Sequence, residues 1–148
     1  MNTVGMTSMV FVLPEPEDGW PPFRVECLYG HASGDVFRPK QAPFFLKGLS
    51  VDDHLRVTKN ADDEVVSWSH VRKSSRSVVW IMQLGEVDLD GVVSHLRLLG
   101  CNTEYLREFA FFAIDVPEEL SMAQVDSILA GVPSKDVAIA YPSVRHRD

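Results

Sequence analysis

Residues 109–116, FAFFAIDV, constrain the fold more than any other stretch, because they are apolar at nearly every position over the length of a strand. A strand that is apolar on both faces belongs in the middle of a sheet, where other layers cover it from both sides. Pro117 follows directly and ends the strand. The pattern therefore predicts a sheet in which this segment is an inner strand.

The segment before this strand predicts a strand, a helix and a second strand. SVVWIMQL (77–84) is a β-branched and aromatic run of strand length. Apolar residues at one-face spacing follow, and we expect a helix that Asp88 caps and Gly100 ends. CNTEYL (101–106) then predicts the strand that precedes residues 109–116.

The segment after this strand predicts a helix and a last strand. Ser121 and Gln124 form the S-x-x-Q pattern of a capping box, and the helix that it opens ends near residues 131–133. DVAIAYP (136–142) is the last strand. The resulting order, β-α-β-β-α-β, predicts a ferredoxin-like plait with two helices on one face of a four-stranded sheet.

The first half of the chain reads as short strands with turn chemistry between them. The expected strands are VFVL (10–13), FRVECLYG (23–30), DVFRPK (35–40), APFFLKGL (42–49), HLRVTK (54–59) and VVSWSHVR (65–72). We expect them to form a small curled antiparallel sheet or half-barrel. The fold class is therefore α+β, with a β-rich half over residues 1–76 and a ferredoxin-like half over residues 77–148, packed as two units or one compact unit.

Charge and cysteine content limit the classes of partner and the cellular location that we expect. The 148 residues carry 14 Lys plus Arg and 21 Asp plus Glu, a net charge of −7, which argues against general nucleic-acid or anionic-membrane binding. Cys27 and Cys101 are far apart in apolar contexts, and we interpret both as buried, reduced thiols, with a disulfide between them as the less favoured alternative. No stretch resembles a secretory signal or a membrane span, so we expect a cytoplasmic protein.

The cluster Asp52-Asp53-His54 allows two interpretations. Gly48 ends one apolar run and His54 begins another, so both aspartates fall at a bend, where such side chains bond to nearby backbone N–H groups. We favour this structural role. The alternative is a catalytic or metal-binding cluster.

Other motifs for catalysis, cofactors or metals are weak. The five histidines and two cysteines lack the paired spacing of a zinc site, and neither a G-x-S-x-G nor a P-loop sequence is present. We therefore expect no enzyme activity, no metal and no cofactor. The phenylalanines of residues 109–112 lack the basic glycine-aromatic context of an RNA-binding sheet, so a nucleic-acid partner is not expected.

Acidic residues on expected loops, together with a tryptophan, predict a protein-binding surface. Acidic loops steer a basic partner, and tryptophan is enriched at binding hot spots. The candidate residues are Trp20, Asp52, Asp53, Asp62, Asp63, Glu64, Glu86, Asp88 and Asp90. For Trp20 the favoured alternative is a lid over the edge of the core, and for residues 86–90 it is the dipole of the following helix.

The stretches APFFLKGLSVDDHLRV, LRLLGCNTEY and FFAIDVPEE, with Val25-Glu26 before them, resemble bacterial domain-of-unknown-function family 4265 over roughly residues 20–142. The chain departs from that family in having Asp52-Asp53 where Gly-Asp is commoner. The resemblance implies no activity, so it assigns no catalytic residue.

The function we predict is a non-enzymatic protein-binding domain, most concretely an immunity-type protein that neutralises a cognate bacterial toxin by occluding its active site. Its partner would have a basic surface, and the chain would be a monomer or a homodimer without a membrane partner. One alternative is a small-molecule-sensing or regulatory ferredoxin-like domain with its ligand beside Gly100. A further alternative is an enzyme that uses Asp52, Asp53 and His54.

Overall fold

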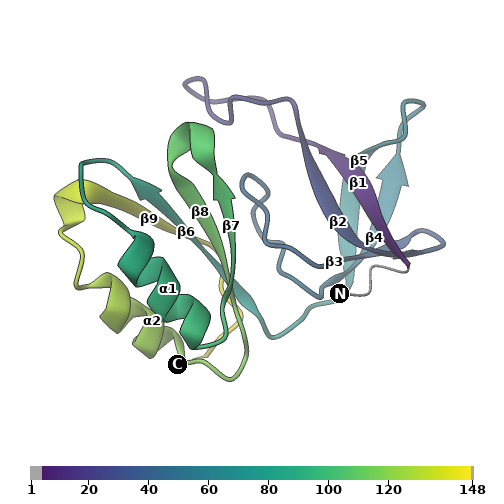
Figure 1. Ribbon diagram of the computed structural model, residues 1–148. Coiled ribbons are helices and arrows are strands. Elements are labelled where there is room, and N and C mark those ends of the chain that lie inside the picture. The colour runs from purple at the N-terminus through teal and green to yellow at the C-terminus, as the bar shows by residue number, and fades with distance from the viewer. Residues whose placement is uncertain (1–4, 148) are drawn as a thin grey trace.

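The computed structural model describes residues 5–147, which form a five-stranded barrel and a four-stranded sheet covered by two helices. Figure 1 shows the barrel on one side of the sheet and both helices on the other. The α+β class is confirmed. The barrel strands come from residues 6–72 and the sheet strands from residues 77–143.

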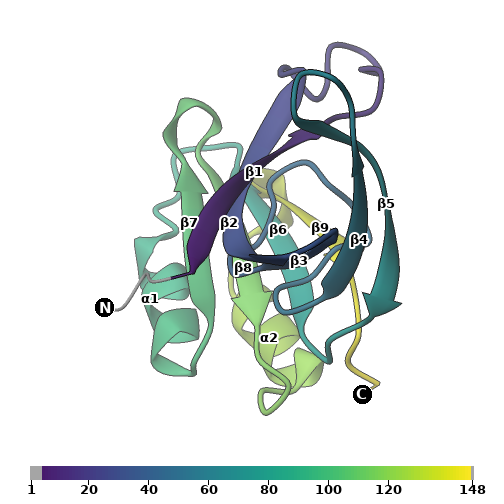
Figure 2. The same ribbon diagram turned by 90° about the vertical axis from the view of Figure 1, so that its right-hand side faces the viewer.

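The barrel is a meander whose first and last strands meet. Its strands are β1 (Met6–Val12), β2 (Val25–Ser33), β3 (Val36–Pro39), β4 (His54–Lys59) and β5 (Glu64–Arg72). Successive strands pair antiparallel, whereas β1 and β5 pair parallel where Val10 and Phe11 lie opposite Glu64 and Val65. The expected half-barrel is thus closed, and Figure 2 shows the barrel from its own side. Closure removes the exposed strand edges that an open sheet of this size would have.

Alternating side chains fill the barrel. Phe11, Leu28, Phe37, Leu55 and Val65 are each at most 1% exposed and form its core. They lie on five different strands at inward positions of the two-residue repeat. Hydrophobic burial at these positions therefore holds all five strands in register.

Residues 42–49, expected to be a strand, are irregular instead, and that prediction is wrong. Pro43 has no N–H to donate to a strand neighbour, and the N–H groups of Phe44 and Phe45 donate to the buried carboxylate of Glu26 at 2.6 and 3.0 Å. The segment lies between barrel and sheet (Figure 1), and Trp80 Nε1 donates to Pro43 O at 2.7 Å. These bonds replace a strand ladder and attach the segment to both halves.

The second half has the predicted element order. It consists of β6 (Ser77–Gln83), α1 (Asp90–Leu98), β7 (Asn102–Leu106), the 3₁₀ turn η1 (Arg107–Phe109), β8 (Phe111–Val116), α2 (Met122–Leu129), the 3₁₀ turn η2 (Ser134–Asp136) and β9 (Val137–Ser143). The strands lie in the order β7-β8-β6-β9, and all neighbours are antiparallel. β8 lies between β7 and β6, is buried along its whole length, and is the inner strand that its sequence predicted.

The inner strands β6 and β8 are largely buried on both faces of the sheet. Val79 and Ile81 of β6 face the helices, whereas Val78 packs with Ala113 and with residues of the segment between barrel and sheet. Arg145, beyond β9, returns to the barrel and binds Asp53. The two halves are therefore connected by apolar packing and by an ion pair.

The helix ends follow local chemistry with one correction. Ser121 Oγ accepts from Gln124 N at 3.1 Å, and the reciprocal contact completes the predicted capping box of α2. Asp88 does not cap α1, because the N-cap position is Leu89; instead Asp88 Oδ1 accepts from Asp90 N at 2.9 Å just before the helix. Gly100, with φ of 104°, takes the position after the helix as predicted.

Candidate functional site

Trp20 lies on a tight turn that its neighbours determine. Glu17 and Trp20 exchange both backbone hydrogen bonds at 2.9 Å, and Asp18 and Gly19 between them have φ of 52° and 77°. Two consecutive positive φ values suit an Asp-Gly pair in a two-residue turn. The turn therefore holds Trp20 at a defined position on the β1–β2 connection.

The tryptophan ring rests on an aromatic cluster between barrel and sheet. Its centroid lies 5.5 Å from that of Phe45 and 5.2 Å from that of Phe109, both edge-on. Phe23 packs on the same two rings at 5.7 and 6.2 Å. Trp20 and Phe23 nevertheless remain 39% and 44% exposed. Trp20 thus covers the edge of the core, as its favoured interpretation predicted, and also presents apolar surface to solvent.

The rings beneath Trp20 are held by a buried carboxylate. Glu26 is 7% exposed, and its oxygens accept from Phe44 N and Phe45 N. Burial raises the pKa of Glu26, and these backbone hydrogen bonds only partly offset the effect. Glu26 therefore fixes the backbone that places Phe45 against Trp20 and Phe23.

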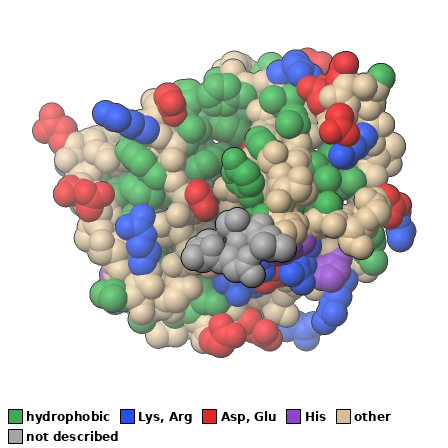
Figure 3. Space-filling model, turned by 45° about the vertical axis from the view of Figure 1, so that its right-hand side comes forward, with side chains coloured by type: hydrophobic (Ala, Val, Ile, Leu, Met, Phe, Trp, Pro, Cys, Tyr) green, Lys and Arg blue, Asp and Glu red, His purple; other side chains and the backbone are tan. Residues whose placement is uncertain are grey.

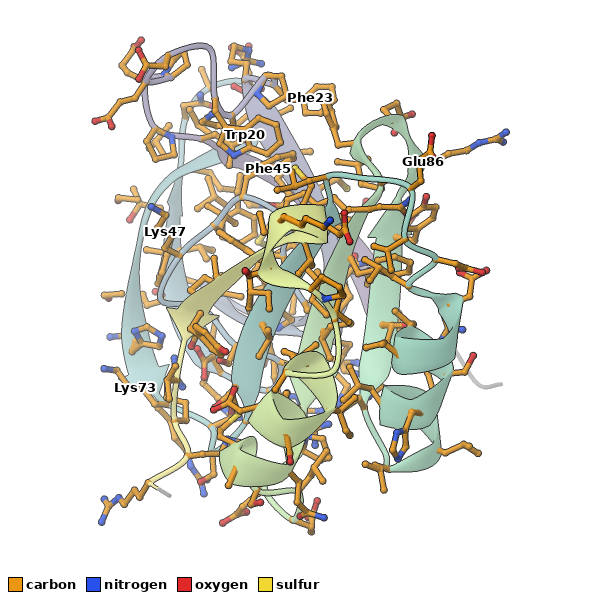
Figure 4. The ribbon with its side chains drawn as sticks, turned by 90° about the vertical axis from the view of Figure 1, so that its left-hand side faces the viewer. Trp20, Phe23, Phe45, Lys47, Lys73 and Glu86 are labelled. Carbon is orange, nitrogen blue, oxygen red and sulfur yellow. The ribbon has the colours of Figure 1, made fainter. Side chains whose placement is uncertain are left out.

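Carboxylates are in excess around these aromatic side chains. The connections at this end are residues 13–24, 59–64, 84–89, 106–110 and 131–136, and Figure 1 shows the first four at its upper edge. Together they hold ten Asp or Glu and four Lys or Arg residues. Figure 4 shows Trp20, Phe23 and Glu86 at this end and Lys73 at the opposite end. We call these five connections, with Trp20 and Phe23, the acidic–aromatic end.

The β4–β5 turn contributes three of the predicted residues. Glu64 accepts a two-pronged hydrogen bond from Arg24, which holds the turn beside the β1–β2 connection and lowers the pKa of Glu64. Asp63, with φ of 63°, pairs with Lys59 at 3.0 Å, and the Asp62 side chain is exposed. Asp62 thus presents the least engaged carboxylate of the three, since Asp63 and Glu64 already have cationic partners.

The β6–α1 connection and the first residue of α1 contribute three more of the predicted residues. Glu86, Asp88 and Asp90 are exposed, with Asp88 accepting from Asp90 N and Asp90 in the first turn of α1. A carboxylate in that first turn stabilises the helix dipole, which is the structural role foreseen for this group. Glu86 lies farthest from the helix and is the member best placed for a partner.

Asp52 and His54 lie away from the acidic–aromatic end. Asp52 occupies the bend with φ of 69°, and its Oδ1 accepts from Lys40 Nζ at 2.6 Å. Both residues line a pocket whose other charged residues are largely cationic. Asp52 therefore belongs to a different surface from the protein-binding set in which the sequence placed it.

Asp53 is the candidate residue that the structure most clearly excludes from the predicted protein-binding surface. It is 0% exposed, so it cannot contribute to a protein-binding surface. Arg145 donates to both oxygens at 2.7 and 2.9 Å, Ser50 N and Ser74 N donate at 2.9 and 2.8 Å, and His70 Nε2 lies 2.9 Å away. Burial alone would raise the pKa of Asp53, but the hydrogen bonds and the charge of Arg145 outweigh it and hold the pKa below its usual value.

The three residues Asp52, Asp53 and His54 do not act as one cluster. The buried carboxylate of Asp53 accepts from Arg145, Ser50 N and Ser74 N, while Asp52 pairs with Lys40 on the pocket surface. Within residues 5–147, no group of three or more His, Cys, Asp or Glu side chains has the arrangement of a metal site.

The two thiols differ in environment. Cys101 is 4% exposed, and burial raises its pKa to about 11, so it is a poor nucleophile at neutral pH. Cys27, expected to be buried, is exposed because it lies at an outward position of β2, and that prediction is wrong. Neither forms a disulfide.

A basic pocket went unrecognised in the sequence. Arg38 and Lys40 join the cations of residues 72–76 around it. The basic stretch VRKSSRS, at residues 71–77, was the available signal, but the contribution of residues 38–40 depends on how β3 pairs in the barrel. Figure 3 shows Lys, Arg and His side chains gathered at the lower right of the molecule beside carboxylates at its lower edge, with apolar side chains between carboxylates higher up.

Known proteins establish the family and the fold. Residues 26–139 match the family model DUF4265, described as a domain of unknown function, and the chain belongs to this family. No curated protein matches the chain. A crystal structure of a hypothetical protein from Neisseria gonorrhoeae is similar, with a TM-score of 0.75 and 12% identity over 93% of this chain and 96% of that one. At this identity the likeness concerns the fold alone.

Among residues 5–147, no helix is both long and apolar enough to cross a bilayer.

Proposed function

We propose that this chain is a non-enzymatic protein-binding domain that contacts its partner through the acidic–aromatic end. Its concrete form is an immunity-type protein that neutralises a cognate bacterial toxin by occluding the toxin's active site. The observation that carries the proposal is the pair Trp20 and Phe23, which stay 39% and 44% exposed although both are packed on Phe45 and Phe109. Because their neighbours already hold them, little side-chain freedom is lost when a partner covers them.

Charge supports a basic partner. The acidic–aromatic end carries ten carboxylates against four cations. Such an excess raises the rate at which a positively charged surface approaches, and it suppresses approach by acidic proteins. The aromatic pair would supply affinity as the buried centre of the interface, and the carboxylates would supply its polar rim.

We also infer that the second half is a ferredoxin-like plait. The order β-α-β-β-α-β, the strand order β7-β8-β6-β9 and the antiparallel pairing of all neighbours support this assignment. The alternative of a sensing domain with a ligand beside Gly100 stays a prediction, since the positive φ of Gly100 already accounts for a glycine after α1. A cytoplasmic location is part of the proposal, and the two free cysteines support it.

The proposal is tested by comparing three forms of the protein as bait in a lysate of the native host. The test variant is the double substitution Trp20→Ala and Phe23→Ala, and the control is Leu98→Ala, an exposed apolar side chain on α1. We expect one basic protein that the wild type and Leu98→Ala retain and the double variant loses, with retention that weakens as salt is added. Purified with this chain, that protein should lose its toxic activity.

The decisive contrary result is a partner retained equally by all three forms while circular dichroism shows that all three are folded. In that case the partner contacts another surface, and the acidic–aromatic end has no part in binding.

A further inference from the structure

The pocket at the end opposite Trp20 has a volume of 420 Å³ and lies between the barrel and the sheet. This volume is in the range of small-molecule sites. Five cationic side chains line it: Arg38, Lys40, Arg72, Lys73 and Arg76. In a chain with a net charge of −7, so local a gathering of positive charge needs an explanation.

The carboxylates of the pocket offset only part of this charge. Asp52, Glu118 and Glu119 line it as well, so the lining cations exceed the lining carboxylates by two, and by one when Asp115, the partner of Arg76, is counted. Lys40 is paired with Asp52 at 2.6 Å, and within residues 5–147 no carboxylate lies within 4.0 Å of Arg72 or Lys73. Arg72 and Lys73 are exposed and are therefore available to a ligand from solvent.

Arg38 is incompletely satisfied. Its Nε is buried and has no hydrogen-bond partner within the described residues, because Asp52 Oδ1 is 3.9 Å away and bound to Lys40. A buried donor without an acceptor is costly. One carboxylate thus serves two cations, and an anion that engaged Lys40 would leave Asp52 free to turn to Arg38.

The backbone that carries the cations is fixed. Ser74 N donates to Asp53 at 2.8 Å, Ser74 Oγ donates to Val51 O at 2.7 Å, and Arg145 donates to Ser74 O at 3.0 Å. Arg76 forms a two-pronged pair with Asp115 at 2.9 and 2.7 Å. The backbone next to Arg72 and Lys73 is therefore ordered before any ligand arrives, and binding has to order only their side chains.

We propose that this pocket binds a small phosphate-bearing anion with at least two negative charges. Guanidinium and ammonium groups together match phosphate oxygens in charge and geometry, and Ser75 adds an exposed hydroxyl. None of the pocket's lining residues is Phe, Tyr or Trp, so it lacks the stacking surface that single-stranded nucleic acids use. Glu118 and Glu119 at the same pocket oppose a long polyanion, which favours a compact ligand.

The inference does not depend on the protein-binding proposal, and its test uses neither the partner nor Trp20. Inorganic pyrophosphate is titrated into the full chain at constant, low ionic strength, by calorimetry and by amide NMR. Binding should be saturable, and the shifted amides should lie in residues 38–40, 52–54 and 72–76.

Four variants sharpen the test. Arg72→Gln and Lys73→Gln should each weaken pyrophosphate binding by ~10-fold, since each removes a charged hydrogen-bond donor. Asp52→Asn removes the competing carboxylate at a positive φ that asparagine accepts, and should strengthen binding by about threefold. Lys135→Gln, an exposed cation in η2 outside the pocket lining, should change nothing.

The proposal is overturned if pyrophosphate fails to bind saturably, or if Lys135→Gln weakens binding as much as Lys73→Gln does. It is also overturned if single-stranded RNA binds with the predicted variant pattern while pyrophosphate neither binds nor competes, since the pocket would then serve a nucleic acid.

Discussion

Replacing Asp53 with asparagine removes the charge that connects the barrel to the end of the chain. Asp53 Oδ1 accepts from Ser74 N and Arg145, and Oδ2 accepts from Ser50 N and Arg145. The amide nitrogen of asparagine must replace one of these oxygens. Whichever way the amide turns, a donor then faces at least two donors.

The expected loss follows from the burial of the pair. Breaking one partner of a buried ion pair costs about 3–5 kcal/mol, because the other charge is left without compensation. Arg145 keeps 12% of its side-chain surface in solvent, so it can partly rehydrate. We therefore expect Asp53→Asn to lower the free energy of unfolding by about 3 kcal/mol, a large share of the ~5–15 kcal/mol typical of a domain.

Urea unfolding followed by tryptophan fluorescence measures this loss. Trp68 reports on the barrel and Trp80 on the sheet, so the emission senses both halves. Asp62→Asn is the matched control, because the same change at an exposed carboxylate should alter the free energy by less than ~0.5 kcal/mol.

The pH dependence of the free energy of unfolding gives a second test of the Asp53–Arg145 ion pair. The folded pKa of Asp53 is lowered, so its stabilisation is fully present above the unfolded value of about 3.9 and is lost as pH falls through the lower folded value. The difference between the wild type and Asp53→Asn should therefore shrink in acid. A difference below ~1 kcal/mol at neutral pH, or one unchanged in acid, would refute the reasoning.

Three further predictions concern single positions. A Cβ at Gly30 would lie 2.2 Å from Arg38 O on the neighbouring strand, so Gly30→Ala should lower the free energy of unfolding in urea by about 3 kcal/mol. Gly91, in contrast, has open space in α1, so Gly91→Ala should raise the free energy of unfolding by about 0.5–1 kcal/mol. Equal effects of the two substitutions would contradict the close packing at Gly30. Ser121→Ala should lower stability by about 1 kcal/mol through loss of the capping box, and an unchanged melting temperature would contradict that role. A disulfide reagent at pH 8 should label exposed Cys27 in the native protein and reach buried Cys101, whose pKa is raised to about 11, only on unfolding; equal labelling rates would contradict the burial.

Local signals in the sequence predicted the second half well. The uninterrupted apolar run of β8 requires cover on both faces, and Ser121 with Gln124 is enough to start α2, so neither depends on distant residues. The predicted cap, Asp88, lies one residue before the actual N-cap, Leu89, because the helix begins at Asp90. Such helix boundaries depend on which backbone N–H groups find acceptors.

Features that depend on distant residues were not predictable in the same way. Asp53 looks like a turn residue until Arg145 is placed beside it, 92 positions later. Residues 42–49 look like a strand until Glu26 takes the N–H groups of Phe44 and Phe45. The basic pocket likewise exists only because β4 pairs with both β3 and β5, which brings residues 38–40 near residues 72–76.

A partner that covers the acidic–aromatic end should slow the exchange of the backbone amides beneath it. Hydrogen–deuterium exchange of this chain, with and without the partner recovered from its host, measures this protection. We expect protection over residues 14–24 and 60–64, whereas residues 72–76 should exchange as in the free chain. Protection confined to residues 72–76 or to the β9 edge, with the Trp20 turn exchanging as in the free chain, would contradict it.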